Sequence, residues 1–269
     1  MPAQGDGDPY MSEFVTSRIE IQETAATIAS ERRFIAGAVD AMKMARRDIE
    51  RQIRKDRFFL TTLEPYDSGS CTSEITARMC AATKRAGVGP MASVAGAIAQ
   101  AGLDAMVSNG CRHAWVDNGG DIALVLESPL TLEIFTTPGS SKAFAFNLRT
   151  TGRAMGICSS SGKLGHSISF GDSDIAVAIA DDAVLADAFA TALGNEVKDR
   201  ASLGKCFDIL RNTKSVKGGL AMMDGTVAMY GEVPELVEVE HSPDRLTLHS
   251  AMCSSRFTGA TKATQEMKV

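Results

Sequence analysis

The segment 183–198, which begins AVLADAFATALGN, constrains the fold more than any other part of the chain. Its apolar spacing predicts a helix, and we expect Asp181 to be the N-cap residue. Six of its sixteen residues have very small side chains: Ala183, Ala186, Ala188, Ala190, Ala192 and Gly194. Such a helix lets another backbone, or a ligand, approach one of its faces closely.

Two polar residues interrupt this small-residue helix. Asp187 and Thr191 are four residues apart, so both side chains project from the same helical face. A carboxylate and a hydroxyl form an oxygen-only ligand set, which suits a hard cation such as Mg²⁺. The same pair is also compatible with a purely structural role, in which Asp187 complements the helix dipole near the first turn. The spacing alone leaves both interpretations open.

A second helix with little side-chain bulk is predicted from Ala92 to Ser108. Gly87, Gly89 and Pro90 precede it, and Asn109–Gly110 ends it. Its first turn presents free N–H groups and the positive end of the dipole, which favour an anion. Its small face is explained equally well by a neighbouring helix that packs closely against it.

The remaining pattern predicts an α+β fold, with mixed or antiparallel sheets flanked by helices. We expect a strand or hairpin over 17–30, an amphipathic helix over 31–57 and a helix from Thr72 or Ser73 to about Arg85. Strands are expected at 113–116, 122–126, 131–136, 143–149, 166–170 and 174–180, and a helix at 203–212. The segment 218–231 reads as a hairpin that turns at Asp224–Gly225.

Length and composition limit the organisation and the partners. Residues 1–14 are expected to be a flexible leader, and 15–269 one domain or two intertwined α+β halves. The net charge of −5 argues against nucleic acid as a general partner, and the basic run 43–57 is interleaved with acids like a solvated helix face. The six cysteines form no CxxC pair, and no secretory or membrane-spanning pattern is present. We therefore expect a cytoplasmic protein, away from membranes, with a homo-oligomer possible.

The segment GICSSSGKLGH at 156–166 carries candidate binding and reacting groups. The loop expected at Ser159, Ser160, Ser161 and Gly162 can cradle a phosphate or carboxylate. It is not a P-loop, because five residues separate its glycines. Cys158 and His166 suggest a nucleophile with a nearby base, and hence a cysteine hydrolase. The alternatives are a buried strand-end thiol and a core histidine.

Four motifs together resemble an uncharacterised ApbE-related family of bacteria and archaea. They are GVGPMASVAGAIAQ (87–100), DNGGDIAL (117–124), GICSSSGKLGHSISFG (156–171) and ADAFATALGN (186–195), in the same order over roughly residues 15–235. ApbE proteins are Mg²⁺-dependent flavin transferases that cleave FAD, release AMP and attach FMN to a threonine of a partner protein. The resemblance implies a pocket for Mg²⁺ and for FAD, FMN or another phosphorylated small molecule.

The resemblance also implies roles for particular residues. The ADAxxT element implies metal ligation by Asp187 and Thr191, joined by the backbone carbonyl of Ala92. Asp187 and His166 are the implied catalytic residues. The implied cofactor-binding residues are Asn118, Gly119, Gly120, Asp121, Ser159, Ser160, Ser161 and Gly162.

The chain departs from the ApbE pattern at two places. Ala95 stands where ApbE proteins carry a lysine of the flavin site, and His166 is followed by SISFGDSD rather than a DPxTG-like segment. Three functions follow from the sequence. They are a Mg²⁺-assisted enzyme on a flavin nucleotide or similar molecule, a flavin or metabolite binder that has lost the chemistry, and the cysteine hydrolase.

Overall fold

The computed structural model describes residues 13–21, 24–136, 142–161, 171–211 and 213–241. Within them, eight strands form one antiparallel sheet in the order β1-β2-β3-β4-β7-β8-β9-β10. The strands are β1 (Phe14–Ile21), β2 (Thr24–Glu31), β3 (Ala114–Asp117), β4 (Asp121–Val125), β7 (Met155–Ser160), β8 (Ile175–Ala180), β9 (Val216–Met223) and β10 (Thr226–Gly231). Segments from both ends of the described chain therefore share one sheet.

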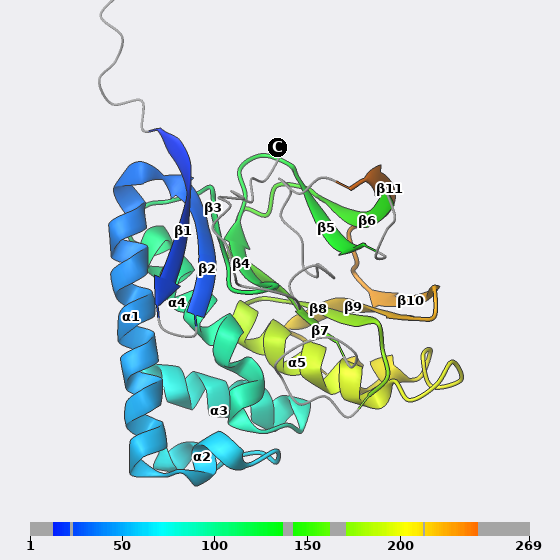
Figure 1. Cartoon of the computed structure of the whole chain (residues 1–269), viewed down its shortest axis with the longest axis horizontal. Coiled ribbons are helices and arrows are strands. Elements are labelled where there is room, and N and C mark those ends of the chain that lie inside the picture. Colours follow the sequence, from blue (N-terminus) through cyan, green and yellow to red (C-terminus); the bar gives the residue numbers. More distant parts are fainter. Residues whose placement is uncertain (1–12, 22–23, 137–141, 162–170, 212, 242–269) are drawn as a thin grey trace, which may run out of the picture.

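A smaller antiparallel sheet has the order β11-β6-β5. Its strands are β5 (Leu130–Thr136), β6 (Lys142–Leu148) and β11 (Glu235–Glu240). This sheet lies on the opposite side of the molecule from helices α3 and α5 (Figure 1). The large sheet is consequently covered by helices on one face and by the small sheet on the other.

The helical layer contains α1 (Arg32–Lys55), α2 (Phe58–Thr61), α3 (Glu74–Ala86), α4 (Val94–Ser108) and α5 (Ala183–Glu196), with 3₁₀ turns η1 (Ser68–Ser70), η2 (Pro90–Ser93) and η3 (Cys206–Leu210). Helix α1 runs along the edge of the molecule beside the β1–β2 hairpin (Figure 1). Its buried stripe includes Phe34, Ala38, Met42 and Ile49, which is the helical periodicity expected from the sequence. Helix α3 begins at a capping box on Ser73 and ends at Gly87, whose φ is 72°.

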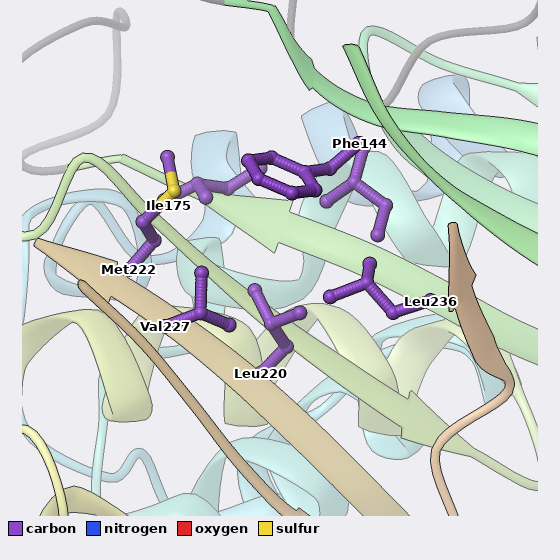
Figure 2. Close-up of a pocket in the computed structure, with 7 residues that line it drawn as sticks. Phe144, Ile175, Leu220, Met222, Val227 and Leu236 are labelled. Atoms are coloured by element: carbon purple, nitrogen blue, oxygen red, sulfur yellow. The ribbon is translucent and has the colours of Figure 1, made fainter. Parts of the chain in front are cut away.

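Alternation along the central strands separates two apolar cores. In β8, which reads IAVAIA, the alanines face the core under the helices and Ile175, Val177 and Ile179 face the core under the small sheet. The small alanine side chains let α5 pack closely against one face of the sheet. The larger side chains on the other face fill the space between the two sheets. At the edge of this second core, Phe144, Ile175, Leu220, Met222, Val227 and Leu236 point toward one another around a small, entirely apolar gap (Figure 2).

The structure confirms the α+β fold class with antiparallel sheets, and most of the expected elements. Asp181 is not the N-cap of α5: that position is occupied by Asp182, whose Oδ1 accepts the N–H of Leu185 at 2.8 Å. The serines at 159–160 end strand β7 instead of standing in a loop, because the strand pairs with both β4 and β8. The segment 203–212 contains a 3₁₀ turn, and β11 was not expected. The strand expected at 166–170 lies outside the described residues.

The stretch Pro90–Ser108 is long and apolar enough to cross a membrane by length and composition alone. In this fold its main part, α4, contacts α1, α5, β3 and β4, and half of the stretch is buried. Packing among four elements accounts for the apolar composition, because a helix surrounded by protein is apolar on most of its faces.

Candidate functional site

Asp187 meets the first turn of α4. Its Oδ2 accepts the backbone N–H of Gly96 at 2.8 Å, and the side chain is only 8% exposed. Gly96 is the third residue of α4, so its N–H has no acceptor within that helix. The carboxylate of one helix therefore satisfies the N-terminus of another, where the dipole also favours a negative charge.

Helix α4 in turn supplies a hydrogen-bond acceptor to the first N–H group of α5. The N–H of Ala183, the first residue of α5, donates to Oε1 of Gln100 at 2.8 Å, and Gln100 is buried. Each helix thus supplies a side chain to the N-terminus of the other. The sequence analysis did not single out Gln100, although it is the one amide side chain of α4 and lies four residues after Gly96.

Glycines allow these backbones to approach. A Cβ atom on Gly96 would lie 2.2 Å from the carbonyl oxygen of Ala183 and 2.7 Å from the Cβ of Asp187. A Cβ on Gly156 of β7 would lie 2.4 Å from Cα of Ala183. The start of α5 is therefore in backbone contact with both α4 and β7. Of the two interpretations of the small face of α4, close helix packing is confirmed at Gly96.

The DNGGD turn between β3 and β4 also contacts the first turn of α4. The Oδ1 of Asp117 accepts the N–H of Gly120 at 2.8 Å, and both glycines have positive φ, 73° for Gly119 and 98° for Gly120. The Nδ2 of Asn118 donates to the carbonyl oxygen of Ala95 at 3.0 Å. The turn is thereby attached to the first turn of α4. Asp117, which the sequence interpretation did not single out, is buried, and burial raises its pKa to about 6.

Asp121 brings a second carboxylate into this region. It is 9% exposed, and its Oδ1 has no hydrogen-bond partner within the described part of the chain. Burial raises its pKa well above the usual range, and the nearby charge of Asp187 raises it further. Burial also raises the pKa of Asp187 to about 7, although the N–H groups of Gly96 and Ala95 favour the charged form. Two buried carboxylates near each other require a proton or a cation to balance them.

Cys158 lies opposite Asp121 in the β4–β7 pairing. Its Sγ is 3.4 Å from the carbonyl oxygen of Ala183, and the residue is fully buried. Burial raises the pKa of this thiol well above its usual value, and the charges of Asp121 and Asp187 act in the same direction. A reactive cysteine needs the opposite environment. The cysteine-hydrolase interpretation is therefore wrong, and the alternative of a buried strand-end thiol is confirmed.

Of the three serines, Ser159 contacts the turn between β3 and β4. The N–H and Oγ of Ser159 both lie within hydrogen-bond distance of the Gly120 carbonyl oxygen, at 3.2 Å and 3.4 Å. Ser160 faces Gly194 of α5, and Ser161 is buried. Gly162 and His166 lie outside the described residues, so their roles stay predictions.

The expected metal ligands belong to adjoining elements. Thr191 is half-buried one turn after Asp187 on α5, and Ala92 is half-buried in η2, which contacts α5. The backbone of Ser93, with φ −133° and ψ 15°, separates η2 from α4. In a continuous α-helix the N–H of Gly96 would bond to the Ala92 carbonyl, but it donates to Asp187 instead.

This donor set fits a hard cation. No three His, Cys, Asp or Glu side chains gather as a metal site among the described residues. A cation here would therefore depend on Asp187 together with a hydroxyl and a carbonyl oxygen, which is the all-oxygen chemistry of Mg²⁺. The carboxyl of Asp121, whose Oδ1 has no hydrogen-bond partner among the described residues, lies close enough to Asp187 for the two groups to interact electrostatically.

Comparison with known proteins identifies the family. A family model described as "AbpE bacteria" matches residues 12–206. The chain belongs to this family. This uncharacterised family is related to ApbE, and curated relatives of the chain carry the name UPF0280 protein. The relative from Methanocella arvoryzae is 39% identical over 232 residues, covering 86% of this chain and 95% of its own. That from Methanosphaerula palustris is 42% identical, covering 87% of this chain and 98% of its own.

Solved structures of ApbE proteins share the fold of this family member. The flavin transferase ApbE from Vibrio cholerae superposes with a TM-score of 0.51 at 14% identity, covering 81% of this chain and 97% of that one. The apo flavinyl transferase ApbE from Pseudomonas stutzeri gives 0.51 at 12% identity, covering 84% and 96%. The resemblance inferred from the four sequence motifs is confirmed at the level of family and fold.

Proposed function

We propose that this AbpE-family protein binds FAD together with Mg²⁺ and cleaves its diphosphate, releasing AMP and passing the FMN phosphoryl group to water or to a hydroxyl of an acceptor protein. The observation that carries the proposal is the buried pair Asp121 and Asp187 at the N-terminus of α4, with one carboxylate oxygen unpartnered. Membership of a family related to flavin transferases, and the shared fold, support the choice of ligand.

In this proposal Asp187, the Thr191 hydroxyl and the Ala92 carbonyl would hold the cation, which when bound would neutralise charge on a phosphoryl oxygen. The turn Asn118–Asp121 and the serines 159–161 bind the substrate beside it. Asn118 fixes the turn by its bond to Ala95, and Ser159 fixes it from β7. His166 positions a reacting group or transfers a proton.

The second candidate is a flavin or metabolite binder without chemistry. It is favoured by Ala95, which stands where the ApbE pattern has a lysine of the flavin site. In the structure Ala95 lies in the first turn of α4, where its carbonyl accepts from Asn118. The position is thus in the candidate site and supplies no charge to a phosphate.

One experiment separates the two candidates. Thermal unfolding is recorded with FAD, FMN, ATP and AMP, each with Mg²⁺ and with EDTA, and the mixtures are then analysed for AMP. The proposed enzyme is stabilised by FAD with Mg²⁺ and releases AMP only in that mixture. Stabilisation by FAD without AMP release identifies the binder. The absence of a response to every flavin contradicts both candidates.

A further inference from the structure

Two cysteines outside the candidate site lie against each other. The Sγ atoms of Cys71 and Cys80 are 3.1 Å apart. Cys71 follows η1 directly and is half-buried, whereas Cys80 lies in the second turn of α3 and is fully buried. Both are thiols in this structure. A disulfide bond of about 2 Å requires the two sulfurs to approach by about 1 Å more.

A buried glutamine holds the loop in this position. Gln52 of α1 is fully buried, and its Nε2 donates to the carbonyl oxygen of Ser70 at 3.3 Å. Its Oε1 accepts the N–H of Thr72 at 2.8 Å. These bonds hold the backbone in place on both sides of Cys71. The contact between the two sulfurs is therefore supported by buried hydrogen bonds to α1.

The other cysteines in the described part of the chain have different neighbours. The thiols of Cys111, Cys158 and Cys206 lie 3.5, 3.4 and 3.1 Å from backbone carbonyl oxygens, those of His113, Ala183 and Leu203. All three are buried. They provide internal controls, because burial alone does not bring two sulfurs together.

We propose that Cys71 and Cys80 form a reversible intramolecular disulfide by exchange with a low-molecular-weight disulfide such as oxidised glutathione. The thiolate of Cys71, the accessible partner, attacks the reagent, forms a mixed disulfide and releases one glutathione thiolate. Cys80 then loses its proton, attacks the Cys71 sulfur and releases the second glutathione. Two protein thiols are oxidised, and one glutathione disulfide is reduced to two thiols.

The bond joins the loop after α2 to α3. That helix contacts both η2 and α5, and Gly89, just before η2, lies so close to Thr62 that a Cβ would be 2.0 Å from the Thr62 carbonyl oxygen. The disulfide therefore crosslinks two segments that each touch the turn leading into α4. The inference stands apart from the proposed function, since it requires no flavin and no metal.

Trypsin makes the test direct, because cleavage at Arg78 separates the two cysteines. The full chain is incubated natively with oxidised glutathione, alkylated, digested and analysed by mass spectrometry. We expect peptide 58–78 to be linked to peptide 79–84, and the intact protein to become lighter by two hydrogen atoms. The Cys253→Ser variant is treated in parallel, because Cys253 lies outside the described residues and is to be removed as a competing thiol.

Two single variants test the order of events. Cys80→Ser is expected to keep one glutathione on Cys71, because the resolving thiol is gone. Cys71→Ser is expected to acquire no glutathione at Cys80, because that sulfur is fully buried. The proposal is overturned if both cysteines of the native chain remain separately alkylated after oxidation, or if Cys71 pairs with a cysteine other than Cys80.

Discussion

Asp187→Asn in metal-free buffer gives the sharpest test of the electrostatics of this site. Asparagine has nearly the same shape, and its side-chain oxygen still accepts the Gly96 N–H. The substitution removes only the ionisable group. A pH-dependent difference between the two proteins therefore reports the burial of this carboxylate together with its effect on the neighbouring Asp121.

The magnitude follows from the pKa. Burial raises the pKa of Asp187 from 3.8 to about 7. Because the folded-state value is the higher one, the group favours folding below pH 4, and that contribution is lost as the pH rises toward 7. A shift of about 3 pKa units corresponds to about 4 kcal/mol. In EDTA, the variant is therefore expected to gain about 4 kcal/mol of unfolding free energy over the wild type between pH 4 and pH 8.

The assay is urea unfolding at half-unit pH steps, with EDTA throughout. The difference in unfolding free energy between variant and wild type should rise with pH and level off above pH 7. Added Mg²⁺ should stabilise the wild type at pH 8 and leave the variant unchanged. Parallel pH profiles for the two proteins would contradict this prediction, because they would mean that Asp187 titrates as an exposed aspartate does.

Three further changes have defined expectations. Gly96→Ala should lower the unfolding free energy by about 3 kcal/mol, because its Cβ would meet backbone atoms of α5. The exposed control Gly37→Ala should raise the unfolding free energy by about 1 kcal/mol. Equal urea midpoints for the two variants would contradict the close contact between the helices. Cys158 should resist iodoacetamide in the native protein and react only after unfolding, so native labelling by mass spectrometry would disprove its burial. Ser73→Ala should cost about 1 kcal/mol by removing the capping box of α3, and no change in thermal stability would show that the cap is dispensable.

Local rules were sufficient for much of the fold. The buried stripe of α1, the Ser73 cap, the Asp224–Gly225 turn and the small residues of α5 each act within a few residues of the chain, so their sequence signals predict the structure directly. The strand β7 did not follow these rules. Its serines favour turns and Gly156 weakens a strand, but pairing on both sides and the close approach of Ala183 decide its conformation.

The sequence predicted which residues belong to the candidate site better than it predicted how they are arranged. The sequence placed Asp187 and the DNGGD turn among the candidates, and the structure brings Asp187 and Asp121 together with Asn118 at one helix end. It could not show that Gln100 satisfies the start of α5, because that bond joins residues 83 positions apart. Nor could it show that one oxygen of Asp121 is buried without a hydrogen-bond partner among the described residues, which depends on tertiary packing.

A metal-assisted flavin site at Asp187 is tested by a calorimetric titration of FAD into the wild type and Asp187→Asn, each in Mg²⁺ and in EDTA. If Asp187 holds a cation beside the bound phosphates, Mg²⁺ should tighten FAD binding to the wild type at least about tenfold, or about 1.4 kcal/mol. The variant should bind FAD with the same affinity in both buffers. An equal effect of Mg²⁺ on both proteins, or no effect on the wild type, would contradict a metal-assisted flavin site at Asp187.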